Sequence, residues 1–133
     1  FIIIDVDNFK TVNDKLGHLT GDQFLEEIAL LLQNAAGSSD VEVARLGGDE
    51  FVCVLQNAAE EEAAEFAETI RAEIGNLTFT NADWQLELSA SLGVASLIPN
   101  ETSSPKELFA LADQALYKAK ESGRNKMVKA SDI

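Results

Sequence analysis

The stretch at residues 45–51, Arg-Leu-Gly-Gly-Asp-Glu-Phe, constrains the fold more than any other part of the chain. It joins an alternating segment at 41–44 to an apolar segment at 51–55. Because glycine reaches positive φ without steric cost, this link predicts a tight β-hairpin. Asp49 and Glu50 then stand side by side on the turn, where the glycines let a ligand approach the backbone. Acidic turn residues are also common as plain solvated groups, so the turn alone leaves both interpretations open.

Length and composition favour one acidic domain and argue against several classes of partner. The chain has 133 residues, 46% of them apolar, which suits a single packed core. Its formal net charge of −13 argues against DNA, RNA and anionic lipid as partners. The single cysteine, Cys53, rules out an intrachain disulfide. No apolar run approaches the ~18–20 residues of a membrane span, so we expect no membrane insertion. A cytoplasmic domain, free or attached to a membrane-anchored sensor, is expected.

The remaining segments alternate between strand and helix patterns. The apolar run at residues 1–4 predicts a central strand buried on both faces. The other expected elements follow in order: a short helix at 8–16, a helix from a capping box at 20–23 to Gly37, the hairpin, a helix ending near Gly75, strands at 84–90 and 92–98 as a second hairpin, a helix opened by Ser104-Pro105, and a strand at 127–128. This order predicts an α+β fold of the ferredoxin-like kind, with a mixed, largely antiparallel sheet flanked by helices.

Acidic residues mark the ends of two of these strands. Asp5 ends the first strand, and Asp49 and Glu50 lie on the hairpin turn. If the two strands are neighbours, these carboxylates converge and repel one another unless a cation lies among them. Oxygen ligands without His or Cys suit Mg²⁺ with a phosphate in its shell. Asp5 could also be a solvated strand end. Asp7 is expected on the other side of the pleat, in a structural role.

Polar residues at 13–22 and basic residues near 120 form two more candidate groups. Taken singly, Asn13 and Asp22 are best explained as residues at helix ends. His18 has no second His or Cys beside it, which argues against a zinc site. Lys120 and Arg124 are four residues apart at a helix end, where they can face one phosphate or simply cap the helix.

Taken in order and spacing, these motifs resemble the GGDEF-domain family, the diguanylate cyclases, which join two GTP molecules into cyclic di-GMP. The resemblance rests on residues 5–10, 13–22, 45–51 and 117–125. It implies a nucleotide-cyclase palm and a set of roles. Asp5, the Val6 carbonyl, Asp49 and Glu50 hold Mg²⁺, with Mn²⁺ as the alternative; Asn13 and Asp22 hold guanine; Phe9, His18, Lys120 and Arg124 contact the substrate; Asp49, Glu50 and Lys10 serve catalysis, Lys10 also as a candidate phosphate contact.

The chain departs from the family pattern in two places. Ser38 and Val41 stand where an Arg and an Asp of an inhibitory product site are expected, so we expect no such site. The helix that precedes the first strand in the family is missing, and residues 1–133 are therefore interpreted as one GGDEF-like domain without its N-terminal segment.

The resemblance implies a homodimer, because one domain carries one GTP and the product contains two. Two other functions stay open at this point. One is a non-catalytic, GTP-binding regulatory domain of the same fold. The other is an acidic interaction module without a nucleotide, for which GTP with Mg²⁺ would give no thermal stabilisation.

Overall fold

The computed structural model describes residues 1–37, 40–80 and 85–133, and a five-stranded sheet forms its centre. Across the sheet the strands are β2 (Val41–Gly47), β3 (Glu50–Leu55), β1 (Ile2–Val6), β6 (Ala90–Val94) and β7 (Met127–Lys129). Neighbouring strands are antiparallel except β6 and β7, which are parallel. The predicted mixed, largely antiparallel sheet with flanking helices is confirmed.

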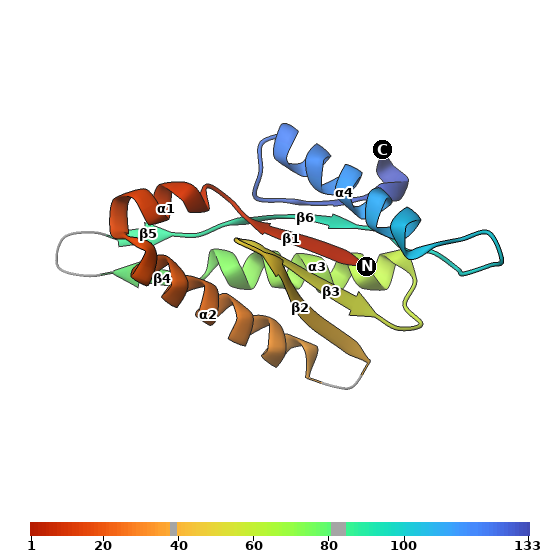
Figure 1. Ribbon diagram of the computed structural model, residues 1–133, viewed down its shortest axis with the longest axis horizontal. Helices are drawn as coiled ribbons and strands as arrows, with labels where there is room; N and C mark the ends of the chain where they lie inside the picture. Colours follow the sequence, from red (N-terminus) through yellow and green to blue (C-terminus); the bar gives the residue numbers. More distant parts are fainter. Residues whose placement is uncertain (38–39, 81–84) are drawn as a thin grey trace.

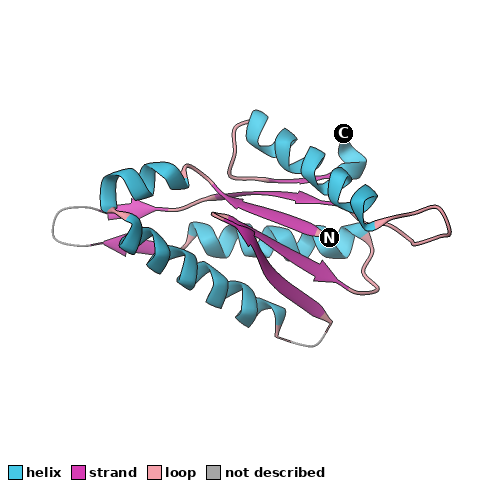
Figure 2. Ribbon diagram, viewed as in Figure 1, coloured by secondary structure: helices cyan, strands magenta, loops and turns pink. Residues whose placement is uncertain are grey.

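Helices cover both faces of this sheet (Figure 1). They are α1 (Phe9–Leu16), α2 (His18–Ala36), α3 (Glu60–Gly75) and α4 (Pro105–Glu121), followed by a short 3-10 helix at Ala130–Asp132. Figure 2 shows α4 on one side of the strands and α2 and α3 on the other. A separate two-stranded sheet, β4 (Thr78–Thr80) with β5 (Gln85–Glu87), extends from one end. Within the described ranges, no helix is both long and apolar enough to cross a membrane.

The alternation of β1 decides which face each of its side chains serves. Ile2, Ile4 and Val6 join the core cluster that includes residues of α2 and α3. Ile3 joins the smaller cluster under α4. Because successive side chains point to opposite faces, Asp5 belongs to the same face as Ile3. The acidic end of β1 therefore faces the C-terminal part of α4.

Close packing fixes the distance between α4 and the sheet. A Cβ atom on Gly93 of β6 would lie 2.1 Å from the Ala112 carbonyl oxygen and 2.4 Å from the Leu116 nitrogen. Both atoms belong to the backbone of α4, which cannot yield as the end of a long side chain can. Only a residue without a side chain at this position lets the helix approach so closely.

Two expectations about element boundaries are wrong. The helix expected from the capping box at 20–23 begins earlier, at His18, because Gly17 has φ 87° and turns the chain directly from α1 into α2. The expected second hairpin is also incorrect. β5 pairs with β4, whereas β6 pairs with β1 and ends at Val94. The start of the expected strand at 84–90 includes Trp84, which lies outside the described residues.

Candidate functional site

The tip of the β2–β3 hairpin is fastened to the end of β1. Gly47 and Gly48 have φ values of 152° and 40°, and the pairing shifts register just before them, so the turn carries a bulge. The Val6 N–H donates to the Asp49 carbonyl at 3.1 Å. Asp5 lies opposite Glu50 in the antiparallel register. The expectation that β1 and the hairpin are neighbours, with their acidic ends together, is confirmed.

A pocket of about 260 Å³ opens beside this tip. Its lining comes from α1, α2 and the hairpin: Phe9, Lys10, Asn13, Asp22, Leu25, Arg45, Gly48 and Asp49. Five of these residues, Phe9, Lys10, Asn13, Asp22 and Asp49, were predicted as site residues from three separate motifs of the sequence. The fold therefore brings the segment at residues 9–22 and the hairpin turn to one pocket.

An unsatisfied acceptor lies in this pocket wall. The side-chain oxygen of Asn13 is buried and has no hydrogen-bond partner within residues 1–37, 40–80 and 85–133. A buried amide oxygen without a partner costs free energy, so its position calls for an explanation. Gly21 of α2 makes room for this group, since a Cβ there would lie 1.9 Å from Asn13 Oδ1. The sequence motif did not indicate this role of Gly21. A glycine near the start of an apolar helix could have indicated that another group packs closely against the helix there.

Arg45 is a second residue that sequence reasoning missed. Its Nε and Nη2 donate to the Gly48 carbonyl at 3.0 and 2.6 Å. The guanidinium thus closes the turn across its base and lines the pocket on the side of Asp22. Arg45 lies opposite Phe51 and shares its face of the sheet. In the sequence, Arg45 follows Val43 at a spacing of two, which places both side chains on one face of the strand. This spacing is the signal that could have indicated a role for Arg45.

The surroundings of Asp5 disfavour its charged form. The residue is only 7% exposed. Burial raises its pKa from 3.8 to about 6; a hydrogen bond from Lys120 opposes the rise, and the charges of Asp49 and Glu50 add to it. The Lys120 ammonium forms an ion pair with the Asp5 carboxylate. Burial lowers the pKa of Lys120, but its contact with Asp5 outweighs this, and the pKa is raised. A cation already stabilises the acidic strand end, and it comes from α4.

The chemistry of this acidic cluster suits a hard divalent cation. Its members offer carboxylate oxygens only, the ligands that Mg²⁺ prefers. As they stand, however, no three His, Cys, Asp or Glu side chains among the described residues form a group that could hold a metal ion. Asp5 and Glu50 lie opposite each other on neighbouring strands. The ammonium of Lys120 forms an ion pair with Asp5 and compensates its charge.

Asp7 is structural, although not on the face that we expected. It lies two residues beyond Asp5, and its carboxylate accepts hydrogen bonds from Ser89, Ser91 and the backbone of Asn125. Asn125 follows α4, so Asp7 and Asp5 both engage the segment at the C-terminal end of that helix. The expectation of opposite faces was wrong because residues two apart in an extended chain point the same way.

Other predicted residues lie outside the 260 Å³ pocket. His18 is the exposed first residue of α2. Arg124 is exposed in the segment between α4 and β7 and has φ 63°. Val41 opens β2 and packs against the core. Ser38, the other position of the expected inhibitory motif, lies outside the described residues. The expectation of no inhibitory product site stays a prediction.

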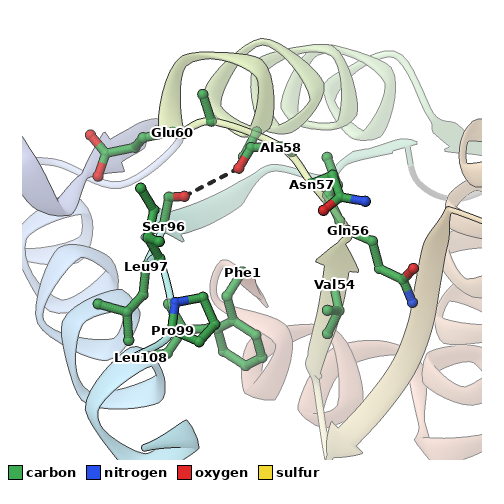
Figure 3. A pocket seen from close by; sticks show the side chains of 14 residues that line it. Phe1, Val54, Gln56, Asn57, Ala58, Glu60, Ser96, Leu97, Pro99 and Leu108 are labelled. Atoms are coloured by element: carbon green, nitrogen blue, oxygen red, sulfur yellow. Dashed lines mark hydrogen bonds between the residues drawn. The ribbon is translucent and has the colours of Figure 1, made fainter. Parts of the chain in front are cut away.

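A second and larger pocket, of about 890 Å³, lies at the opposite end of β1 (Figure 3). Phe1, Val54, Leu97 and Leu108 give it a largely apolar wall. The Ser96 hydroxyl, drawn in Figure 3, donates to the Ala58 carbonyl at 3.2 Å and so is already satisfied. None of the predicted site residues lines this pocket. Its size exceeds that of the pocket at the hairpin tip, but the residues predicted from the sequence line the pocket at the tip.

Comparison with known proteins gives a consistent result. The family model described as "Diguanylate cyclase, GGDEF domain" matches residues 1–126. The uncharacterized protein YhcK of Bacillus subtilis (strain 168) is 45% identical over 128 residues, which are 95% of this chain and 35% of that protein. The probable diguanylate cyclase DgcT of Escherichia coli (strain K12) is 37% identical over 128 residues, 96% of this chain and 28% of that protein. The chain thus spans about a third of the length of these two relatives.

A solved structure shares the fold over nearly the whole chain. It is the GGDEF domain of DgcB from Caulobacter crescentus, in complex with c-di-GMP. The match has a TM-score of 0.90 at 30% identity and covers 98% of this chain and 76% of that one. Such agreement extends the similarity from the sequence motifs to the arrangement of all the main elements.

Proposed function

The chain belongs to the GGDEF family of diguanylate cyclase domains, and from this membership we propose that it converts two GTP molecules into cyclic di-GMP. In each of two steps, a 3′-hydroxyl oxygen forms a bond to the α-phosphorus of the other GTP. The bond from that phosphorus to the bridging oxygen of pyrophosphate breaks, and the hydroxyl proton passes to a base. We assign the base to Asp49, which lines the pocket at the hairpin tip.

One observation carries the proposal. One pocket is lined by Asn13, by the acid Asp22 and by Asp49 of the hairpin tip. Guanine offers N1–H and its exocyclic amine as neighbouring donors, and a carboxylate can accept from both. Adenine offers no such pair. The pocket therefore supports a guanine nucleotide with its reacting end toward the acidic strand end.

Mg²⁺ is the cofactor that this proposal includes, with Mn²⁺ as the alternative. Asp5, the Val6 carbonyl, Asp49 and Glu50 would hold it, and the ion would neutralise charge at the α-phosphate. Phe9 and His18 are assigned to substrate contact, Lys120 and Arg124 to the phosphates, and Lys10 to the phosphates and catalysis. Lys120 would exchange its ion pair with Asp5 for a phosphate when a divalent cation takes over that carboxylate.

Turnover requires two domains, since each holds one GTP and the product contains two nucleotides. The test is incubation of the concentrated chain with GTP and Mg²⁺, with the products separated by chromatography. Cyclic di-GMP formation whose specific rate rises with chain concentration would support the proposal. GTP binding without any product, at a concentration at which the chain is dimeric, would favour the non-catalytic regulatory domain instead.

Guanine selectivity gives a sharper prediction about Asp22. Asp22→Asn replaces one carboxylate oxygen by an amide N–H donor, which faces the N1–H and exocyclic amine donors of guanine. We expect the preference for GTP over ATP to fall by about 10²-fold, the value of roughly two charge-assisted hydrogen bonds. Calorimetric titration with non-hydrolysable analogues of the two nucleotides measures it.

The matched control for this experiment is Asp14→Asn. Asp14 is an exposed acid of α1 outside the residues that line the pocket. It changes the net charge by the same amount and should leave the preference unaltered. Equal affinities of the unmodified chain for the two analogues would refute the guanine assignment.

A further inference from the structure

Three donors converge on the buried carboxylate of Asp7. The hydroxyls of Ser89 and Ser91 donate to it at 2.8 and 2.7 Å. The backbone N–H of Asn125 donates to it at 3.0 Å. Asp7 is 7% exposed, so these charge-assisted bonds are poorly screened by water. The end of β1 is thereby tied both to the start of β6 and to the segment that follows α4.

The tie to Asn125 coincides with unusual backbone geometry. Arg124 and Asn125 have φ values of 63° and 47°, in the left-handed region that residues other than glycine seldom adopt. Two such residues in a row persist only where surrounding contacts hold them. Besides the bond to Asp7, Asn125 receives a hydrogen bond on its side-chain oxygen from Arg71 Nη1 at 3.0 Å. The Arg124 N–H donates to the Ala119 carbonyl at 2.9 Å.

The same strand end also holds the start of this segment. Lys120 is paired with Asp5, and Asn125 is bonded to Asp7. The segment 120–125 is therefore held at both of its ends, at Lys120 by Asp5 of β1 and at Asn125 by Asp7, which follows β1. Arg124 lies within the fastened stretch, directly beside the second tie.

We propose that Asp7 is a positioning residue for phosphate binding. Through the Asn125 N–H it holds the left-handed turn that sets the place of Arg124. Asp7 itself does not touch the substrate. This inference rests on the proposed function, in which Lys120 and Arg124 bind the phosphates of GTP.

The test compares two probes in calorimetric titrations of the chain with Mg²⁺ present. One probe is a non-hydrolysable GTP analogue, and the other is guanosine, which shares the base and lacks the phosphates. Asp7→Asn keeps the size of the side chain but cannot accept from all three donors. We expect the affinity for the GTP analogue to fall about tenfold or more, because a small displacement of a positioning group has effects of this order. The affinity for guanosine should stay unchanged.

Two further variants separate this role from general stabilisation. Ser91→Ala removes one bond to Asp7 but leaves the bond to Asn125, so it should lower the melting temperature without selective loss of affinity for the GTP analogue. Arg124→Ala should lower the affinity for the GTP analogue and leave the affinity for guanosine unchanged. If Arg124→Ala has that effect and Asp7→Asn does not, the inference about Asp7 is overturned and the proposed function stands. If Arg124→Ala has no effect, the inference about Asp7 falls together with the assignment of Arg124 to the phosphates, while the proposed conversion of GTP is decided by the assay for cyclic di-GMP.

A variant that keeps the core intact covers the case in which Asp7→Asn does not fold. Asn125→Pro, at an exposed position, removes the N–H that donates to Asp7 and cannot adopt the φ of 47° that the turn has there. A selective loss of affinity for the GTP analogue in this variant supports the positioning role. Unchanged affinity for both probes overturns it.

Discussion

Asp49→Ala should lower the rate of cyclic di-GMP formation by at least about 10³-fold, the order seen when a group that stabilises developing charge is removed. The backbone of Asp49 is held by the Val6 N–H. Truncation of the side chain therefore removes a carboxylate from the hairpin tip and leaves the turn in place. Chromatographic assay of product and circular dichroism of the fold, run side by side, measure the two parts of this expectation.

Asp113→Ala is the control, because Asp113 is an exposed acid of α4 away from the hairpin tip. It should keep the full rate. Retained turnover in the Asp49→Ala chain would contradict the roles assigned to Asp49.

Asp5→Ala should abolish synthesis as well, with a further signature in the metal-free chain. The pKa of Asp5 is raised from 3.8 to about 6, so the folded chain binds its proton more tightly than the unfolded chain does. The contribution of Asp5 to stability then falls as pH rises from about 4 to about 6. Above that window the Asp5→Ala chain should melt at the same temperature as the parent chain or higher. A melting temperature several degrees lower at pH 7 would show that the ion pair with Lys120 outweighs the cost of burial.

Gly93→Ala is expected to lower the free energy of unfolding by about 3 kcal/mol, near the upper end for overpacked cores. The added Cβ would meet backbone atoms of α4 at 2.1 and 2.4 Å, so the helix or β6 must move. Since α4 carries Lys120, a shift of the helix should also weaken the contact with Asp5. Urea denaturation followed by circular dichroism measures the loss.

The matched control is Gly75→Ala at the end of α3, where a Cβ would meet no atom within 4 Å. Alanine there should hold or raise stability by up to about 1 kcal/mol, because it restricts the unfolded chain and favours helix. If the two variants were equally stable, the close approach of α4 to β6 would not be a constraint on the fold.

Periodicity and turn chemistry were enough to predict most of the fold. The apolar run of β1, the hairpin through Gly47 and Gly48, and the Ser104 cap of α4 are local patterns, and the structure keeps all three. The errors arose where a neighbour in space decided the outcome. β4 has only three residues, and β5 pairs with it. β6 instead pairs with the apolar strand β1.

The same division holds for the candidate site. The resemblance to the GGDEF family predicted Asn13, Asp22 and Asp49 as site residues, and the fold gathers them at one pocket. Gly21 and Arg45 were missed because their roles depend on tertiary contacts, one with the Asn13 amide and the other with the turn carbonyl. A sequence pattern indicates which groups are available, whereas steric room and backbone acceptors depend on how the elements pack.

The position of β1 also has consequences for how the domain is made. β1 is the first strand of the chain and the middle strand of the sheet, and Ile2 pairs with Val94. While the chain is being synthesised, this strand, apolar except for Asp5, has an open edge until β6 has left the ribosome. Sheets assembled from such distant pairs fold slowly. The yield of folded protein should therefore depend on how well β1 is shielded in the nascent chain, and variants that delay the docking of β6 should aggregate more even when the finished domain is equally stable.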